Sequence, residues 1–124
     1  MVNKASKAHI YEQIVFQIKL GIAKKKLKSG DPLPSVRAMA KLLSVSTLSV
    51  QRAYKELQVE GIIESSSGKG NFISASINKS LIKETLFQGV EEEMKQPISI
   101  AKQNGIELED FQELVRFLWE ESAN

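Results

Sequence analysis

The sequence predicts a mainly α-helical fold with one small β-hairpin. Apolar residues recur at helical spacing along most of the 124 residues and at strand-like spacing over one short stretch. The expected order is three helices, the hairpin and then two further helices. Charge divides the chain just after the hairpin: residues 1–75 carry 12 Lys and Arg against 5 Asp and Glu, whereas residues 76–124 carry 5 against 10. We therefore expect a basic domain that suits a polyanion and an acidic tail that suits another protein.

The first helix is expected from about Ala8 to Lys26. Ile10, Ile14, Ile18 and Ile22 recur at every fourth residue and form one apolar stripe along it. The segment LKSGDPLP then ends the helix, because its two prolines impose an extended backbone on the residues before them. The next helix can begin only after this segment.

Two short helices with a brief break between them follow. Ser35 is placed to cap the first and Ser46 the second, because a serine oxygen accepts hydrogen bonds from free N–H groups at a helix N-terminus. Their buried faces are expected to consist of Val36, Met39, Ala40, Leu43, Val50, Ala53, Tyr54 and Leu57. Gly61 is expected to end the second of these helices.

A hairpin is predicted after Gly61, where IIE and NFI flank the turn-forming stretch SSSGKG. Gly68 and Gly70 can adopt the positive φ that tight turns require, and Lys69 lies between them at the tip. One helix, a closely spaced pair of helices and a hairpin with a basic tip are the elements of a winged helix-turn-helix. In that fold the second helix of the pair enters the major groove of DNA, and the hairpin, called the wing, reaches the backbone or minor groove.

The entrance of the expected recognition helix, SVSTLS, is small and polar. Such residues let the backbone approach a duplex while they present hydrogen-bond donors and acceptors. Capping alone explains Ser46, but it explains Thr47 and Ser49 less well, because both lie inside the helix. The pattern therefore favours a DNA-reading helix.

Residues 11–75 resemble the DNA-binding domain of the GntR family of bacterial transcription regulators. The resemblance rests on YEQI, LPSVR, VSTLSVQRAYKEL, EG and GKGNF, which follow the family's order and spacing. The forms LPSVR and RAYKEL are closest to the short YtrA-type branch, in which only a pair of helices follows the DNA-binding domain. The resemblance implies a sequence-specific regulator, usually a repressor, that binds an inverted-repeat operator in double-stranded DNA as a homodimer. Members of the branch commonly control transporter genes.

The resemblance also implies which residues contact DNA. They lie at the start of the helix after LP, in the recognition helix and in the wing: Ser35, Arg37, Ser46, Thr47, Ser49, Gln51, Arg52, Ser67, Gly68, Lys69 and Gly70. Arg37 has a plainer alternative, an ordinary surface ion pair, although arginine dominates contacts with DNA. Leu48 stands where many family members have a polar or basic residue. It either contacts a thymine methyl group or packs inside the protein.

The acidic tail, residues 76–124, is expected to form two helices that make a dimerisation segment. The first runs from Ile77 to Gln103 with a bend at Pro97, and Asn104 and Gly105 end it. The second carries the apolar stripe expected at the dimer interface: Leu108, Phe111, Leu114, Val115, Leu118 and Trp119. Two helices cannot cover their own apolar faces, so a second copy of the chain covers them or they fold back onto the winged domain. The general prevalence of two-fold dimers and the resemblance favour the second copy.

Several other classes of protein are disfavoured. The chain has no cysteine and a single histidine, His9, so we expect no disulfide and no metal site. No cofactor and no catalytic activity are expected, because no nucleophile–base pair or phosphate-cradling motif is present. The N-terminus lacks the apolar run of a signal peptide and no stretch is long enough to span a membrane, which predicts a soluble cytoplasmic protein.

One alternative function stays open at this point. An architectural or protein-interaction winged helix would bind DNA without sequence preference and use its acidic tail to recruit a partner. The sequence does not decide whether a small-molecule effector is sensed, although a ligand could lie at a dimer interface.

Overall fold

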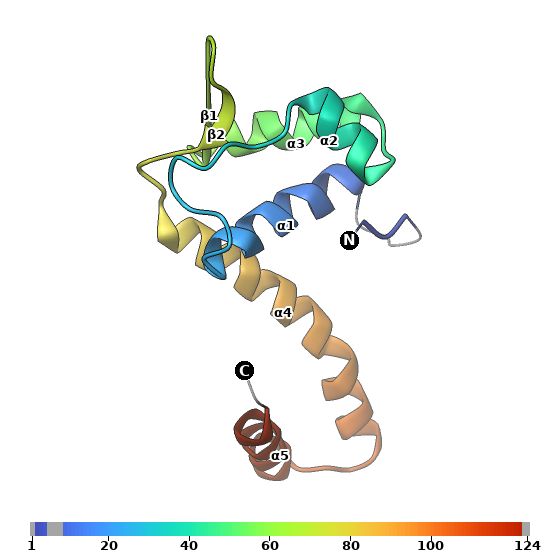
Figure 1. The fold of residues 1–124 in the computed structure, drawn as a ribbon. Helices are drawn as coiled ribbons and strands as arrows, with labels where there is room; N and C mark the ends of the chain where they lie inside the picture. Colours follow the sequence, from blue (N-terminus) through green and yellow to red (C-terminus); the bar gives the residue numbers. More distant parts are fainter. Residues whose placement is uncertain (1, 5–8, 123–124) are drawn as a thin grey trace. The chain divides into compact units, whose positions relative to one another are not determined.

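The computed structural model describes residues 2–4 and 9–122 and has the expected order of elements (Figure 1). The described elements are α1 (Ile10–Ala23), α2 (Val36–Leu43), α3 (Thr47–Val59), β1 (Ile63–Ser66), β2 (Gly70–Ile73), α4 (Lys79–Gln103) and α5 (Leu108–Glu121). The mainly helical class with a small β wing is therefore confirmed. The chain divides into two compact units, Met1–Leu86 (unit 1) and Phe87–Asn124 (unit 2). This division falls within α4, whereas the predicted domain boundary at residue 75 lies before that helix.

α1 ends earlier than the sequence pattern predicts. Its expected start at Ala8 lies outside the described residues, and its expected end at Lys26 is wrong. Lys25 adopts a left-handed backbone with φ of 62°, and the N–H groups of Lys26 and Leu27 both donate to the carbonyl of Gly21 at 2.9 and 3.1 Å. These bonds end the helix at Ala23. They form a C-terminal cap whose left-handed position is usually occupied by glycine and is here occupied by Lys25.

The predicted caps of α2 and α3 are both present. The Ser35 hydroxyl accepts a hydrogen bond from the N–H of Ala38, and the Ser46 hydroxyl accepts one from the N–H of Ser49, each at 3.1 Å. Between the helices Ser44 takes a left-handed conformation with φ of 55°. This tight reversal fixes where α3 begins relative to α2.

The wing consists of β1 and β2, which pair antiparallel from Ile63↔Ile73 to Ser66↔Gly70. The segment before α2 borders the second strand: the Leu33 N–H donates to the Asn71 carbonyl at 2.8 Å, and the Ile73 N–H donates to the Asp31 carbonyl at 2.9 Å. The base of the wing is therefore attached to the segment that leads into α2.

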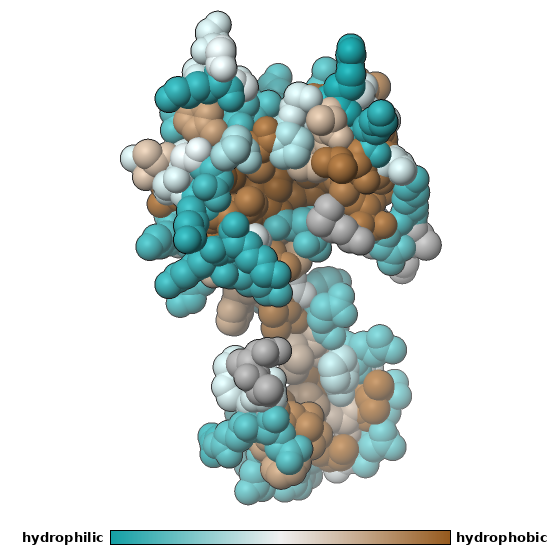
Figure 2. All heavy atoms as spheres, in the orientation of Figure 1, coloured by the Kyte–Doolittle hydropathy of each residue, from teal (hydrophilic) through white to brown (hydrophobic). Residues whose placement is uncertain are grey.

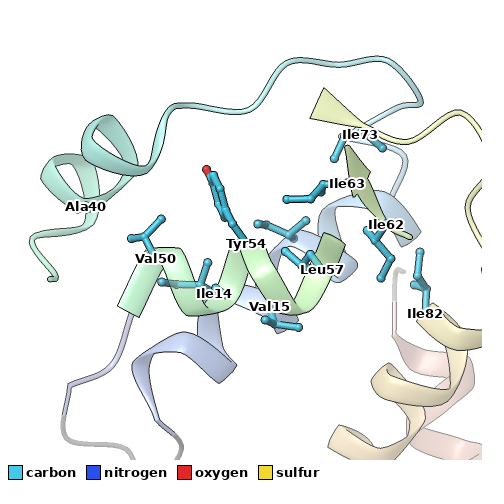
Figure 3. Packing of buried hydrophobic residues seen from close by; sticks show 12 residues of the cluster. Ile14, Val15, Ala40, Val50, Tyr54, Leu57, Ile62, Ile63, Ile73 and Ile82 are labelled. Atoms are coloured by element: carbon cyan, nitrogen blue, oxygen red, sulfur yellow. The ribbon is translucent and has the colours of Figure 1, made fainter. Parts of the chain in front are cut away.

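α3 is the central helix of unit 1 (Figure 3). Its buried residues Val50, Ala53 and Leu57 are fully covered, each with 0 % of its surface exposed. They belong to one apolar cluster with residues of α1, of the wing, of the position just before the wing and of α4, namely Ile14, Ile18, Ile62, Ile63, Ile73 and Ile82. The inclusion of Ile82 explains why the first turns of α4 belong to unit 1.

A buried ion pair joins three parts of unit 1. Lys19 on α1 is 2 % exposed. Its Nζ lies 2.9 Å from Oε1 of Glu60, the residue that follows α3, and donates to Oγ1 of Thr85 on α4 at 3.0 Å. A buried ammonium is stable only with such partners, because its loss of hydration must be offset. The contact therefore ties the beginning of α4 to the end of α3.

Tyr54 provides a test of this packing. The residue is 2 % exposed, and its hydroxyl donates to the Pro34 carbonyl at 2.7 Å, so it ties α3 to the segment before α2. Burial raises the pKa of Tyr54 from its ordinary 10.0 to about 12. Above pH 10 the unfolded chain loses this proton while the folded chain retains it, so stability falls as pH rises from about 10 to 12.

We expect Tyr54→Phe to lower the free energy of unfolding by about 1 kcal/mol at neutral pH, because the Pro34 carbonyl loses its partner. The substitution should also remove about 1 kcal/mol of the alkaline loss of stability between pH 8 and pH 11. Urea unfolding of both proteins at the two pH values measures both effects. An identical pH dependence in the two proteins would contradict this assignment.

Candidate nucleic-acid interface

The outer face of α3 carries polar and basic side chains. Gln51 and Lys55 are exposed and lie one helical turn apart, so they share one face of the helix. Val50 and Leu57 point away from that face into the core. Thr47 is also exposed, in the first turn. α3 is therefore held by one face and offers the other to a partner.

The serine hydroxyls at the entrance of α3 are engaged in local bonds. Ser46 accepts from the Ser49 N–H, and its own hydroxyl donates to Ser49 Oγ at 3.0 Å. Ser35 makes the equivalent cap of α2. These residues thus shape two helix N-termini, whose remaining N–H groups and dipoles attract anions such as phosphate.

The two predicted arginines differ in their surroundings. The guanidinium carbon of Arg52 lies 3.8 Å from the centre of the Tyr11 ring, a cation–π contact that holds the exposed Arg52 against α1. Arg37 is exposed in the first turn of α2. In the described part of the chain it takes part in no ion pair, so the surface ion pair considered for it does not form there.

The tip of the wing is a tight turn between β1 and β2. The Lys69 N–H donates to the Ser66 carbonyl at 3.2 Å, and Gly68 and Gly70 have φ of 86° and 68°. Both glycines therefore adopt the positive φ that the sequence predicts for them. Ser67 and Lys69 are exposed, so the tip presents a hydroxyl and an ammonium to the solvent.

Sequence reasoning missed further basic groups near this surface. Lys55 lies one turn beyond Gln51 on α3, a spacing that could have singled it out. Lys4 donates from Nζ to the Ser44 carbonyl at 2.7 Å, at the turn between α2 and α3. No local pattern predicts this second contact, because the two residues are 40 positions apart in the chain.

Unit 2 exposes much of its apolar surface. α5 has no buried residue, and Leu118 and Trp119 are 55 % and 78 % exposed. A hollow of about 790 Å³ within unit 2 is lined largely by apolar residues of α4, of the following turn and of α5, among them Ile98, Ile106, Leu108, Phe111, Val115 and Trp119. Figure 2 shows such residues, in brown, at the surface of this unit. The expected dimer stripe is therefore open to solvent in the single chain.

The functional groups described above in unit 1 are hydrogen-bonding and positively charged groups, which suit the binding of a polyanion. These hydroxyl, amide, guanidinium and ammonium groups lie at the starts of α2 and α3, on the outer face of α3 and at the tip of the wing. The model of the bacterial regulatory proteins of the gntR family matches residues 10–73, which contain all of these groups except Lys4. The chain belongs to the GntR family. It is a DNA-binding transcription regulator with a winged helix-turn-helix, as the sequence pattern predicts.

Similarity to other GntR proteins extends beyond the winged domain. The transcriptional repressor YtrA of Bacillus subtilis is 38 % identical over 115 residues, which are 93 % of this chain and 88 % of YtrA. A transcriptional regulator from Oenococcus oeni has a similar structure, with a TM-score of 0.69 and 29 % identity over 95 % of this chain and 97 % of that one. YtrA from Sulfolobus acidocaldarius gives a TM-score of 0.59 and 33 % identity over 73 % of this chain and 96 % of that one.

The described residues lack two further kinds of feature, a membrane-spanning helix and a metal-binding cluster. None of their helices is both long and apolar enough to cross a membrane. Residues 2–4 and 9–122 also contain no group of His, Cys, Asp and Glu side chains that could hold a metal ion.

Proposed function

We propose that this GntR regulator is a homodimeric repressor that binds an inverted-repeat operator. The observation that carries the proposal is the division of α3 into a buried face and an exposed face with Thr47, Gln51 and Lys55. A recognition helix needs this division, since one face anchors it and the other enters the major groove. The name of the similar Bacillus protein, a transcriptional repressor, supports repression as the outcome of binding.

Each part of unit 1 takes a role in this proposal. Thr47, Ser49, Gln51 and Arg37 read base edges or fix the register beside them, and Ser35, Ser46 and Arg52 bind the phosphate backbone around them. The tip of the wing, Ser67–Gly70, reaches the backbone or minor groove next to the site. The acidic unit 2 is repelled by DNA and therefore serves a protein contact.

The protein contact that we propose is with a second copy of the chain. The exposed apolar residues of α5 and the hollow beside them require a cover, and an identical apolar surface provides one with two-fold symmetry. A two-fold dimer would present two copies of α3 to half-sites about one helical turn of DNA, or a multiple of it, apart. By the family resemblance, the regulated genes would encode a transporter, and the protein would act in the cytoplasm without a cofactor.

A first test concerns the electrostatic part of binding. If Lys69 contacts phosphate, Lys69→Ala should weaken binding to every duplex alike and reduce the dependence of log affinity on log salt by about 0.9 per chain. Fluorescence anisotropy with two unrelated duplexes over a range of KCl concentrations measures both quantities. Lys95→Ala, at an exposed position of α4 in unit 2, is the matched control and should change neither. A salt-independent affinity of the wild type would contradict the phosphate contacts.

A second experiment distinguishes a sequence-specific repressor from an architectural protein that binds DNA non-specifically. The full chain should select inverted repeats from a library of random-sequence duplexes. Selection of no common sequence would favour the architectural alternative, in which DNA binding is non-specific and the acidic tail recruits another protein.

A further inference from the structure

Leu48 is an apolar side chain at the polar entrance of α3. It is 74 % exposed, whereas its neighbour Val50 is completely buried. The alternative left open by the sequence, packing inside the protein, is therefore wrong. Leu48 lies in the first turn of the recognition helix and points into solvent.

The geometry of the helix places Leu48 on the same face as two polar candidates. Gln51 follows it by one turn and Lys55 by two turns, and all three are exposed. The buried residues Val50 and Leu57 lie on the other side of α3. A duplex that approaches Gln51 and Lys55 must therefore also meet Leu48.

A leucine on this face can recognise only a limited part of DNA. It has no hydrogen-bond donor or acceptor, so it cannot read the amino, carbonyl or ring-nitrogen groups of the base edges. Among the unmodified bases, only thymine presents an apolar group in the major groove, its C5-methyl. Burial of the leucine against this methyl group would remove apolar surface of both from water.

We infer that Leu48 recognises the C5-methyl group of a thymine in each half-site of the operator. This inference rests on the proposed function, because it needs α3 to lie in the major groove. It adds an apolar base contact that the serine hydroxyls of α3 and the amide of Gln51 do not supply. Leu48 is thus a specificity-determining residue of this chain.

The experiment replaces thymine with uracil, which lacks only the methyl group and pairs in the same way. The probe is the duplex selected by the full chain from the random library, with the same thymine of both half-sites changed together, one position at a time. At one such position uracil should weaken binding of the wild type about three- to tenfold. The Leu48→Ala protein should bind the thymine and uracil duplexes equally.

Leu42→Ala is the matched control. Leu42 is 72 % exposed, nearly as much as Leu48, but lies on α2. This variant should keep the full effect of uracil. Both substitutions are at exposed positions, so neither should disturb the core, and circular dichroism would verify the fold.

The possible results separate this inference from the function on which it rests. If a sequence is selected but no uracil weakens wild-type binding, the methyl contact is refuted and the repressor proposal stands. If Leu48→Ala retains the uracil effect, another residue reads the methyl group and the assignment to Leu48 is wrong. If no sequence is selected at all, both proposals fail together.

Discussion

Leu118→Asp is expected to convert the protein from a dimer into a monomer. Leu118 belongs to the apolar stripe of α5, in the last turn of the helix, and is 55 % exposed in the single chain. The monomer therefore tolerates a carboxylate at this position. In the proposed interface the same carboxylate would be buried without a partner, which costs several kcal/mol. Multi-angle light scattering should give twice the chain mass of 13.8 kDa for the wild type and the chain mass itself for the variant.

The loss of the dimer should also reduce operator binding. A monomer contacts one half-site, so it loses the gain of roughly 100-fold to 10,000-fold that linked binding of two half-sites provides. Leu118→Met is the control, because it preserves apolar volume at the same position and should remain a dimer with unchanged affinity. A wild type that is monomeric at micromolar concentration, or a Leu118→Asp protein that stays dimeric, would refute the proposed interface.

Gln51→Ala and Arg37→Ala should each reduce the preference of the protein for its operator over random DNA. Gln51 lies on the exposed face of α3, and an amide there can form a bidentate pair with adenine, whose loss costs about 1–3 kcal/mol of discrimination. Arg37, exposed at the start of α2, either reads a base edge or fixes the register of α3 beside it. Competition binding with the operator and a scrambled duplex measures the preference.

Lys26→Ala provides the control for this prediction. Lys26 belongs to the exposed basic run after α1, to which we assign only long-range attraction to DNA. Its removal should weaken binding to both duplexes slightly and leave their ratio unchanged. If the Gln51 and Arg37 variants behave in the same way, these side chains only hold the backbone, and sequence reading must come from elsewhere.

The features that the sequence predicted well are local ones. The stripe of isoleucines in α1, the serine caps of α2 and α3 and the glycines of the wing each act within a few residues of their own position. Helical periodicity, capping and positive φ are each determined by residues close together in the sequence. The end of α1 was predicted incorrectly because Lys25 takes a left-handed conformation that the pattern reserves for glycine.

The features that the sequence could not predict are contacts between distant parts of the chain. Lys19 pairs with Glu60, 41 positions away, and with Thr85, 66 positions away, so nothing in the local sequence marks it as buried. The stacking of Arg52 on Tyr11 likewise depends on how α1 and α3 pack. For Leu48 the pattern allowed two positions, inside or outside, and only the packing of α3 decides between them.

The central claim, sequence-specific binding by a two-fold dimer, is tested most directly with the wild-type chain and two duplexes. One carries the selected inverted repeat, and the other has the same base composition in scrambled order. Measured at one fixed salt concentration, the affinities should differ by roughly 1,000-fold or more in favour of the inverted repeat. Equal affinities for the two duplexes would contradict the claim.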